Sequence, residues 1–156
     1  MPSALSRGPI TTALVAHLET STFPVGDNAA PSDPYGWQGE PDGVPSTFIP
    51  WLSLQPGTAV AQSPPGTLGD TGTEWRLSYA VFYAGVTRKQ QEALADRMRN
   101  VLVNITRQGV VTDTGTWRIQ KVSCSGVGSS NRIGSAYPDY YTQTDNFEVW
   151  ITKENF

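Results

Sequence analysis

The sequence predicts an α/β fold of the α+β type, with a single mixed or antiparallel β-sheet of about four strands, two flanking helices and long Pro/Gly-rich loops. Three observations favour this class. A strand pattern over 74–84 passes directly into a helix pattern, three further stretches have strand character, and a short helix pattern lies near the N-terminus. The 156 residues fit one domain, 1–156, with long excursions at about 24–47 and 55–73.

The first predicted helix covers residues 9–19, with Pro9 in its first turn. Ile10, Leu14 and Leu18 recur at helical spacing and predict a buried stripe. His17, the single histidine, lies beside that stripe. A lone histidine in this position is more often a packed or hydrogen-bonded core residue than a ligand.

Chain-breaking residues dominate the stretch from Pro24 to Gly72, which contains nine of the twelve prolines and eight of the fifteen glycines. Within it, residues 46–54 have strand character. Pro50 cannot donate a ladder hydrogen bond, so we expect this strand at a sheet edge or with a bulge at Pro50. The second excursion, 55–73, favours a hairpin arm.

The central predicted unit is the strand 74–84 and the helix after it. Trp75, Leu77, Tyr79, Val81 and Tyr83 share one face by alternation. On the other face, two apolar side chains near the strand's end indicate that both faces are covered there. The two side chains are Ala80 and Phe82.

Thr87, with Gln90 three positions later, predicts a capping box at the start of the second helix. Gln108-Gly109 predicts its end. A helix that directly follows a strand can pack back onto the same sheet, so we expect this unit to form the core. The apolar stripe of the helix consists of Leu94, Met98, Val101, Leu102 and Ile105.

Two more strands are predicted, at 115–124 and 144–152. By alternation, Trp117 and Ile119 lie on one face of the first, and Val122 and Cys124 on the other. In the last strand Trp150 falls on the outward face, where either a loop or a partner subunit covers it. Phe147, Val149 and Ile151 point inward.

Charge is scarce and unevenly distributed. Charged residues make up 16% of the chain, which has a formal net charge of −3. From Gly8 to Trp75 there are seven acids and no base, a charge of −7; from Arg76 to Lys121 there are eight bases and three acids, a charge of +5. Such segments can pair within one subunit or between copies. The net acidity argues against sequence-specific nucleic-acid binding.

No pattern for catalysis, cofactor binding or metal binding is present. The chain has one histidine and one cysteine, Cys124, and lacks both a nucleophile elbow and a phosphate-binding Walker sequence. It also lacks an apolar run long enough to span a membrane and a signal peptide. We therefore expect a protein that is not an enzyme, uses no cofactor and is made and kept in the cytoplasm.

The element order and two passages resemble the tail terminator, or tail completion, proteins of long-tailed bacteriophages. The passages are Trp75–Leu94, a strand followed by a capped helix, and the final strand Thr144–Ile151. The resemblance extends from about residue 74 onward and includes the N-terminal helix, but the proline-rich region has no counterpart in it.

This resemblance implies a virion subunit that forms a hexameric ring, caps the tail tube, stops its polymerisation and contacts the head-side connector, with DNA only as passing cargo. It implies no membrane contact. A neck or head–tail joining protein of similar fold, or a minor tail protein, remains open. A small binding module that holds a peptide or glycan through aromatic loops is the alternative of another class. The positions expected at interfaces are Tyr35, Trp37, Trp51, Leu68, Arg88, Lys89, Tyr137, Tyr140, Tyr141 and Trp150.

Overall fold

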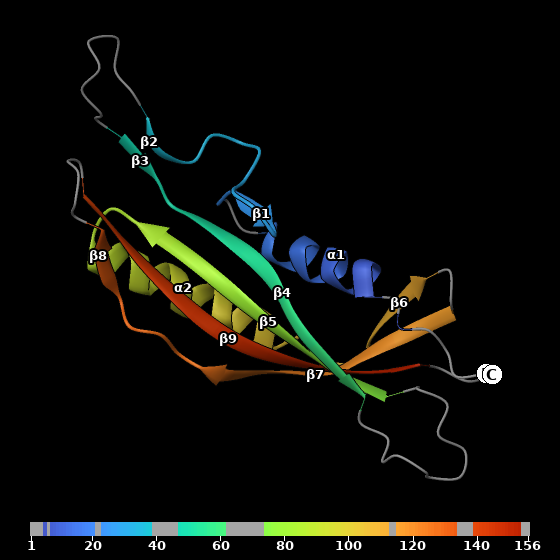
Figure 1. The fold of residues 1–156 in the computed structure, drawn as a ribbon. Helices are drawn as coiled ribbons and strands as arrows, with labels where there is room; N and C mark the ends of the chain where they lie inside the picture. Colours follow the sequence, from blue (N-terminus) through green and yellow to red (C-terminus); the bar gives the residue numbers. More distant parts are fainter. Residues whose placement is uncertain are drawn as a thin grey trace.

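A curled, mixed β-sheet of seven strands forms the body of the protein (Figure 1). The computed structural model describes residues 5, 7–20, 23–38, 47–61, 74–112, 115–133 and 139–153. The prediction of one sheet of about four strands is wrong, because short strands that carry no clear alternation extend the sheet at both edges. Strands predominate over helices in the described chain.

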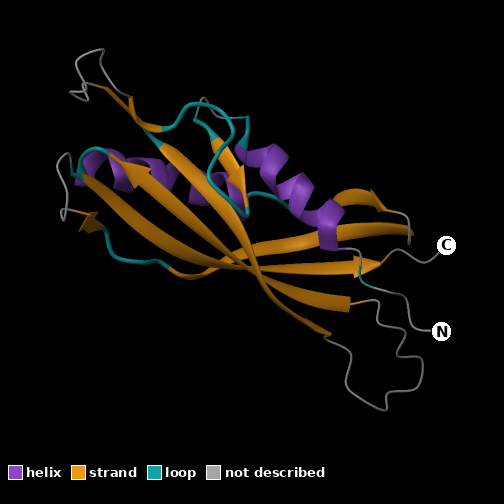
Figure 2. Cartoon of the chain, turned by 45° about the horizontal axis from the view of Figure 1, so that its top comes forward, coloured by secondary structure: helices purple, strands orange, loops and turns teal. Residues whose placement is uncertain are grey.

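Four long strands make up the centre of this sheet: β4 (Trp51–Ala61), β5 (Glu74–Gly85), β9 (Tyr140–Lys153) and β7 (Gly115–Gly126). Each pairs antiparallel with the next in this order. At the edges, β1 (Val25–Asp27) pairs parallel with β4, and β6 (Gln108–Thr112) pairs antiparallel with β7. The short β8 (Asn131–Ile133) continues the β7 side along β9. Figure 2 shows the long strands crossing as the sheet twists.

The predicted strand 46–54 is divided at Pro50 into two elements. Residues Thr47–Ile49 form β3, which pairs with β2 (Gly36–Gln38) in a separate two-stranded sheet. Beyond Pro50, β4 begins and continues to Ala61, so part of the predicted loop 55–73 is strand. The break at Pro50 agrees with its missing N–H, but the edge position is wrong, because β4 has neighbours on both sides. The register shift of β4 falls between Pro56 and Ala59 instead.

The two excursions predicted from the sequence contain further structure. The first, 24–47, includes β1 and β2. Since each has three residues, neither could show a period. β4 and β5 form a long antiparallel hairpin as far as the pair Ala61 and Trp75, and residues 62–73 lie outside the described part.

Two register shifts in β7 change which side chains reach the core. Ile119 pairs with Ile151 and Lys121 with Trp150, so Gln120 is the extra residue of a bulge. The bulge resets the alternation, and Val122 points to the same side as Ile119. The prediction that Val122 and Cys124 lie on the opposite face from Trp117 is therefore wrong.

Both helices pack on one face of the sheet, α1 (Arg7–Leu18) beside β1 and β6, and α2 (Arg88–Val103) across β5, β9 and β7. The predicted cap is confirmed, since Thr87 Oγ1 accepts from Gln90 N at 3.1 Å. Gln90 Oε1 in turn accepts from Val86 N at 2.7 Å. The predicted helix end at Gln108-Gly109 is wrong, because α2 stops at Val103 and residue 108 begins β6.

The hydrophobic core lies between the helices and this face. Ile10, Leu14 and Leu18 of α1 are buried there, as the N-terminal pattern predicts. From the sheet, Leu77, Val81, Trp117 and residues of β9 join them. The opposite face of the sheet, which we call the open face, is covered by neither helix. The buried α2 residues of the core are Leu94, Ala95, Met98 and Leu102.

Candidate functional site

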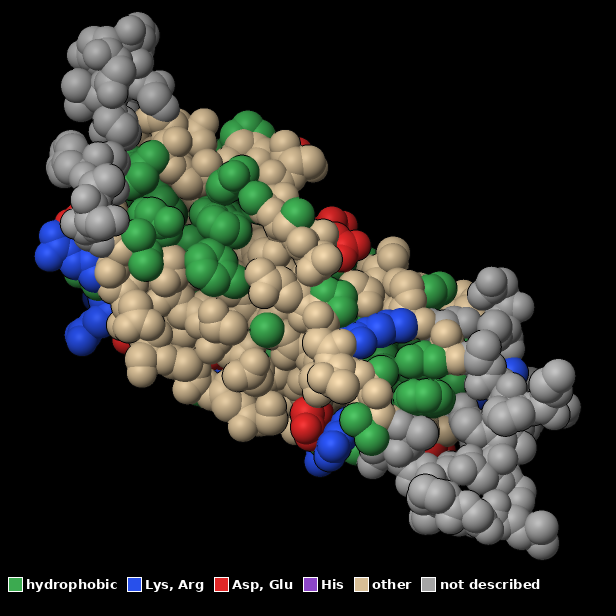
Figure 3. Space-filling model, viewed as in Figure 1, with side chains coloured by type: hydrophobic (Ala, Val, Ile, Leu, Met, Phe, Trp, Pro, Cys, Tyr) green, Lys and Arg blue, Asp and Glu red, His purple; other side chains and the backbone are tan. Residues whose placement is uncertain are grey.

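Hydrophobic side chains gather at one end of the open face (Figure 3), and several of them are aromatic. They line a groove of about 320 Å³, which we call the aromatic groove. Its rings contact one another edge-on or stacked, with centroid distances between 4.9 Å for Tyr35–Trp51 and 6.0 Å for Phe48–Tyr140. None of the described residues that line it is charged, so these walls offer ring faces and neutral polar atoms. The residues of the groove are Tyr35, Gly36, Trp37, Phe48, Trp51 and Tyr140.

The β2–β3 hairpin places most of these rings. Trp37 pairs with Phe48 in the register, and their ring centroids lie 5.4 Å apart. Gly36 has a φ of 69°, a conformation that side-chain-bearing residues rarely adopt. This backbone conformation lets the chain turn between Tyr35 and Trp37, so that both rings reach the same groove.

The groove is anchored to the main sheet through Trp51. Its ring lies 5.1 Å from that of Phe82 on β5, on the face turned away from the core. Beside these two rings lies a second hollow of about 230 Å³, bordered by Ala29 and Ser53. Ser53 Oγ donates to the Ala29 carbonyl oxygen at 2.8 Å and ties the segment after β1 to the open face.

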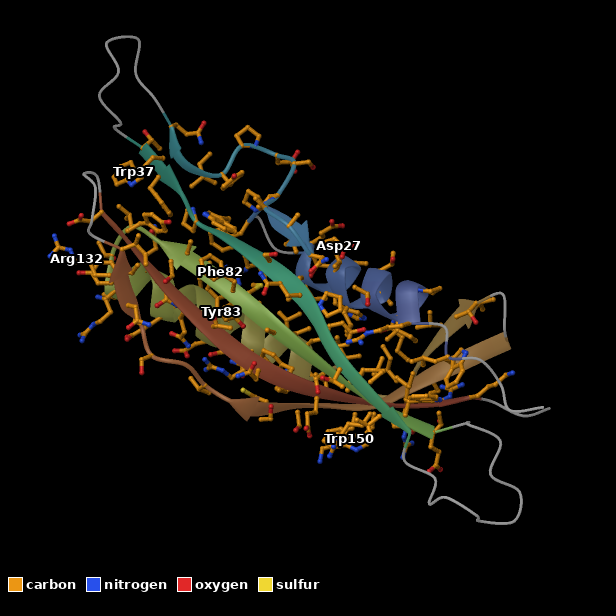
Figure 4. The ribbon with its side chains drawn as sticks, viewed as in Figure 1. Asp27, Trp37, Phe82, Tyr83, Arg132 and Trp150 are labelled. Atoms are coloured by element: carbon orange, nitrogen blue, oxygen red, sulfur yellow. The ribbon has the colours of Figure 1, made fainter. Side chains whose placement is uncertain are left out.

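The opposite end of the open face carries Trp150 (Figure 4). The Lys121 ammonium lies 5.3 Å from the centre of its ring, a cation–π contact. Arg76 on β5 is the register partner of Trp150, and its Nε lies 3.8 Å from Oε1 of Glu148, two residues before Trp150 on β9. Trp150 is thus partly covered by its own chain.

The predicted interface residues are divided among several places. Tyr35, Trp37, Trp51 and Tyr140 meet in the aromatic groove. Arg88 and Lys89 lie exposed on the first turn of α2, outside the groove. Tyr141 follows Tyr140 in β9 and so points to the other face of the sheet. Leu68 and Tyr137 lie outside the described residues.

Phe48 and Phe82 belong to the groove or its support, but the sequence did not single them out. Phe82 was predicted to be covered, and Trp51 covers it. The signal available for Phe48 was its position three residues before Trp51 in a Pro-flanked strand. Only the pairing of β3 with β2 brings Phe48 opposite Trp37.

Behind the sheet at the groove end lies a buried polar network centred on Asp145, which is fully buried. Arg99 Nη2 donates to its Oδ2 at 2.8 Å, and the Gln143 amide and the Gly128 N–H donate to its Oδ1 at 2.8 and 3.0 Å. Gln91 Nε2 extends the network to Gln143 at 3.1 Å. The network fastens α2 and the β7–β8 connection to β9.

This environment also acts on two titratable groups. Burial, and then the charge of Asp145, raises the pKa of Tyr83 well above its ordinary value. For Arg99, burial alone lowers the pKa, but the hydrogen bonds that it donates to Asp145 and Asp96 outweigh this effect, so the net pKa is raised. Tyr83 therefore stays neutral and Arg99 charged at neutral pH.

The single histidine and the single cysteine both make contacts within the fold. His17 Nε2 is hydrogen-bonded to Gln108 Oε1, in agreement with the core interpretation. Cys124 is half-buried, with its Sγ 3.6 Å from the Gly126 carbonyl oxygen. Within the described ranges, no three His, Cys, Asp or Glu side chains are grouped so that they could hold a metal ion. Neither described helix has the length and apolar character needed to cross a membrane.

Several charges have no ion-pair partner among the residues that the structure describes. On the acidic side these are Glu19, Asp27, Asp33 and Glu74, and on the basic side Lys89, Arg97 and Arg107. The acidic and basic segments thus do not neutralise each other through these residues.

Comparison with known proteins finds no matching family model and no matching curated protein. Among solved structures, one chain of 12% sequence identity matches with a TM-score of 0.48, covering 98% of this chain and 99% of the other. Its name states no activity. At this level the likeness carries no conclusion about function.

Proposed function

We propose that this chain is a virion structural protein that works as a tail terminator of a long-tailed bacteriophage. Copies of it form a ring, in the family's manner a hexamer, which caps the tail tube and stops its polymerisation. The ring contacts the tube protein on one side and the head-side connector on the other, and DNA passes through it as cargo. Assembly takes place in the host cytoplasm, and the protein is neither an enzyme nor a cofactor binder.

The observation that supports this proposal most is the aromatic groove on the open face. Its described lining residues are uncharged and mostly aromatic, and it lies at the end of a sheet whose other face is covered by both helices. Aromatic residues are enriched where protein surfaces associate, and charged residues are depleted there. The class of assembly comes from the resemblance of Trp75–Leu94 and Thr144–Ile151 to the terminator family.

The unpaired charges give a second reason for ring formation. A head-to-tail ring joins two different patches of the same subunit, so one patch can be acidic and the other basic. Asp27 lies at the free edge of the sheet beside α1, whereas Lys89 lies at the start of α2 (Figure 4 labels Asp27). A neighbouring copy can bring such charges together although one subunit does not.

A binding module is a second candidate, because the groove itself has the size of a small-ligand site, which is roughly 300–1,000 Å³. In that case the monomer would bind a peptide or glycan tightly without assembling. A neck or joining protein is a variant of the first proposal, and labelling the protein within virions separates the two by its position.

Electron microscopy of the purified protein, alone and with tail tubes, tests the proposal. We expect rings at the ends of tubes and tubes that stop growing when the protein is added. Monomers that neither associate nor bind tube ends overturn it. If those monomers bind a peptide or glycan library component tightly, the binding module is the correct alternative.

A further inference from the structure

We propose that the aromatic groove of one copy of this chain binds the proline-containing segment 62–73 of a second copy, through Pro64 and Pro65. This inference deepens the proposed function, on which it rests, by assigning the contact that joins neighbouring subunits. The groove is defined by its described lining residues, and the segment is identified by its sequence, Gln-Ser-Pro-Pro-Gly-Thr-Leu-Gly-Asp-Thr-Gly-Thr.

The chemistry of the groove fits proline. Proline-rich segments dock in grooves lined by aromatic rings, because the extended proline helix is preformed and loses little conformational entropy on binding. Here Tyr35, Trp37, Phe48, Trp51 and Tyr140 supply the rings, and Gly36 leaves space between them. Since the described lining residues of the groove are all uncharged, a neutral pair such as Pro64-Pro65 packs against them without desolvating a charge on these residues.

A chain cannot place this segment in its own groove. β4 begins with Trp51 in the groove and runs to Ala61, ten steps of about 3.3 Å, or roughly 30 Å away. Pro64 follows Ala61 by three residues, so it lies at most about 11 Å from Ala61. Figure 1 shows β4 running from the β2–β3 end of the molecule to the opposite end. The segment therefore reaches a groove only on another copy.

Charge favours the same pairing. From residue 62 to residue 74 the chain contains two acids, Asp70 and Glu74, and no base. At the same end of the sheet, but on the face that the helices cover, α2 begins beside Lys89, which has no ion-pair partner among the described residues. An acidic segment approaching a basic helix start adds electrostatic steering to the apolar contact.

A contact between opposite ends of identical subunits is head-to-tail. Such contacts generate rings when the rotation closes and filaments when it does not. In the proposed contact each copy supplies its groove to one neighbour and its proline pair to the other, so every copy of a ring uses both.

A peptide titration tests the recognition step directly. The host is the full chain with Pro64→Ala and Pro65→Ala, so that its own segments do not compete, and the ligand is a synthetic peptide of residues 60–73. We expect a saturable change in tryptophan fluorescence with this peptide and at least about ten-fold weaker binding for the peptide with both prolines replaced. Equal binding of the two peptides, or none by either, overturns the inference.

Mixing of variants tests the contact between whole chains. The first variant, Trp37→Ala, damages the groove, and the second, Pro64→Ala with Pro65→Ala, damages the segment. In sedimentation experiments each variant alone should remain monomeric, whereas the mixture should form dimers, because one intact groove meets one intact segment. Tyr35→Ala, at a side chain that is 39% exposed, replaces Trp37→Ala if the latter does not fold.

Pro41→Ala with Pro45→Ala is the matched control, since these prolines lie between β2 and β3 in sequence. This control should associate as the native chain does. If it loses association and the Pro64 and Pro65 variant keeps it, the groove is filled by its own hairpin and the inference is wrong.

The two proposals fail in different ways. If the native chain caps tail tubes and the Pro64 and Pro65 variant caps them equally well, the groove contact is overturned and the terminator function stands. If the native chain neither associates nor caps tubes, the terminator function fails, while the peptide titration still decides the specificity of the groove.

Discussion

Arg99 of α2 and Asp145 of β9 form an ion pair with 2.8 Å between Nη2 and Oδ2, and the Asp145 side chain is fully buried. The same carboxylate accepts hydrogen bonds from Gln143 and from the Gly128 backbone. One carboxylate therefore holds a helix, a strand and a loop together immediately behind the surface that carries the aromatic groove.

Replacing this carboxylate should be costly. Asp145→Ala leaves the Arg99 guanidinium and the Gly128 N–H without their acceptor, and we expect the free energy of unfolding to fall by about 3–5 kcal/mol. The matched control is Asp96→Ala, which removes the exposed partner of the same arginine and should cost less than about 1 kcal/mol. Urea unfolding of both variants measures the difference, and equal losses would contradict this account.

Arg7 should stabilise the pairing of β4 with β5 at the register shift between Pro56 and Ala59. Its guanidinium donates to the Gly57 carbonyl oxygen and, at 2.7 Å, to that of Ser78, and it lies 4.9 Å from the centre of the Tyr79 ring. Arg7→Ala leaves these carbonyl groups without that donor, so we expect a loss of about 1–3 kcal/mol in unfolding free energy. Chemical denaturation measures it.

The control for Arg7 is Arg88→Ala, which removes an exposed arginine whose Nε lies 4.0 Å from Glu92. That substitution should change stability by no more than about 0.5 kcal/mol. Hydrogen exchange adds a local test, because Arg7→Ala should speed exchange in β4 near Gly57 and leave β7 unchanged.

Tyr83 should make the fold sensitive to alkaline pH. Its pKa is raised by burial and by Asp145, so the folded chain keeps a proton that the unfolded chain releases near pH 10. The folded state then binds more protons than the unfolded state, and the unfolding free energy falls as pH rises above about 10, by at most about 1.4 kcal/mol per pH unit. Below that pH this contribution to stability is fully present.

Tyr83→Phe removes the titrating group and leaves the ring in place. Urea unfolding of the native chain and this variant, from roughly pH 8 to pH 11, compares their slopes. We expect a shallower alkaline decline in the variant, and parallel curves would show that other groups cause the decline.

Association should weaken with salt if the unpaired charges join neighbouring copies. Exposed charges are screened over about 10 Å at 0.1 M salt, so ring formation should decline as salt increases. Lys89→Glu should weaken association further at low salt, and the difference from the native chain should shrink at high salt. Sedimentation at several salt concentrations measures this, and an association constant independent of salt would argue against charge pairing.

Local signals predicted the parts of the fold that depend on neighbouring residues. The alternation over 74–84 and the cap at Thr87 lie in short windows of sequence, and β5 and the start of α2 occur where those signals place them. The edge strands could not be predicted this way. β1 and β2 have three residues each and are strands only because β4 and β3 pair with them.

For the candidate site, too, local signals in the sequence predicted some features, and long-range pairing determined the others. Residue type alone pointed to Tyr35, Trp37, Trp51 and Tyr140, because aromatic clusters serve both subunit packing and ligand stacking. Their meeting in one groove depends on the register between β2 and β3 and on the placement of β4 and β9 on either side of β5. Leu68 and Tyr137 share the composition signal, but no described element positions them.

The extra residue in β7 has a consequence for how this chain tolerates changes in length. Gln120 is exposed, and its Nε2 donates to Thr152 Oγ1 at 2.7 Å. Without it, Ile119, Lys121 and Val122 would alternate inward, outward and inward against Ile151, Trp150 and Val149, as they do now. A chain that lacked Gln120 would keep the same core residues, and the main change would be the loss of the local bend that the bulge gives to β7. At position 120, therefore, β7 can differ in length by one residue while its core-facing and solvent-facing side chains stay on the same faces of the sheet.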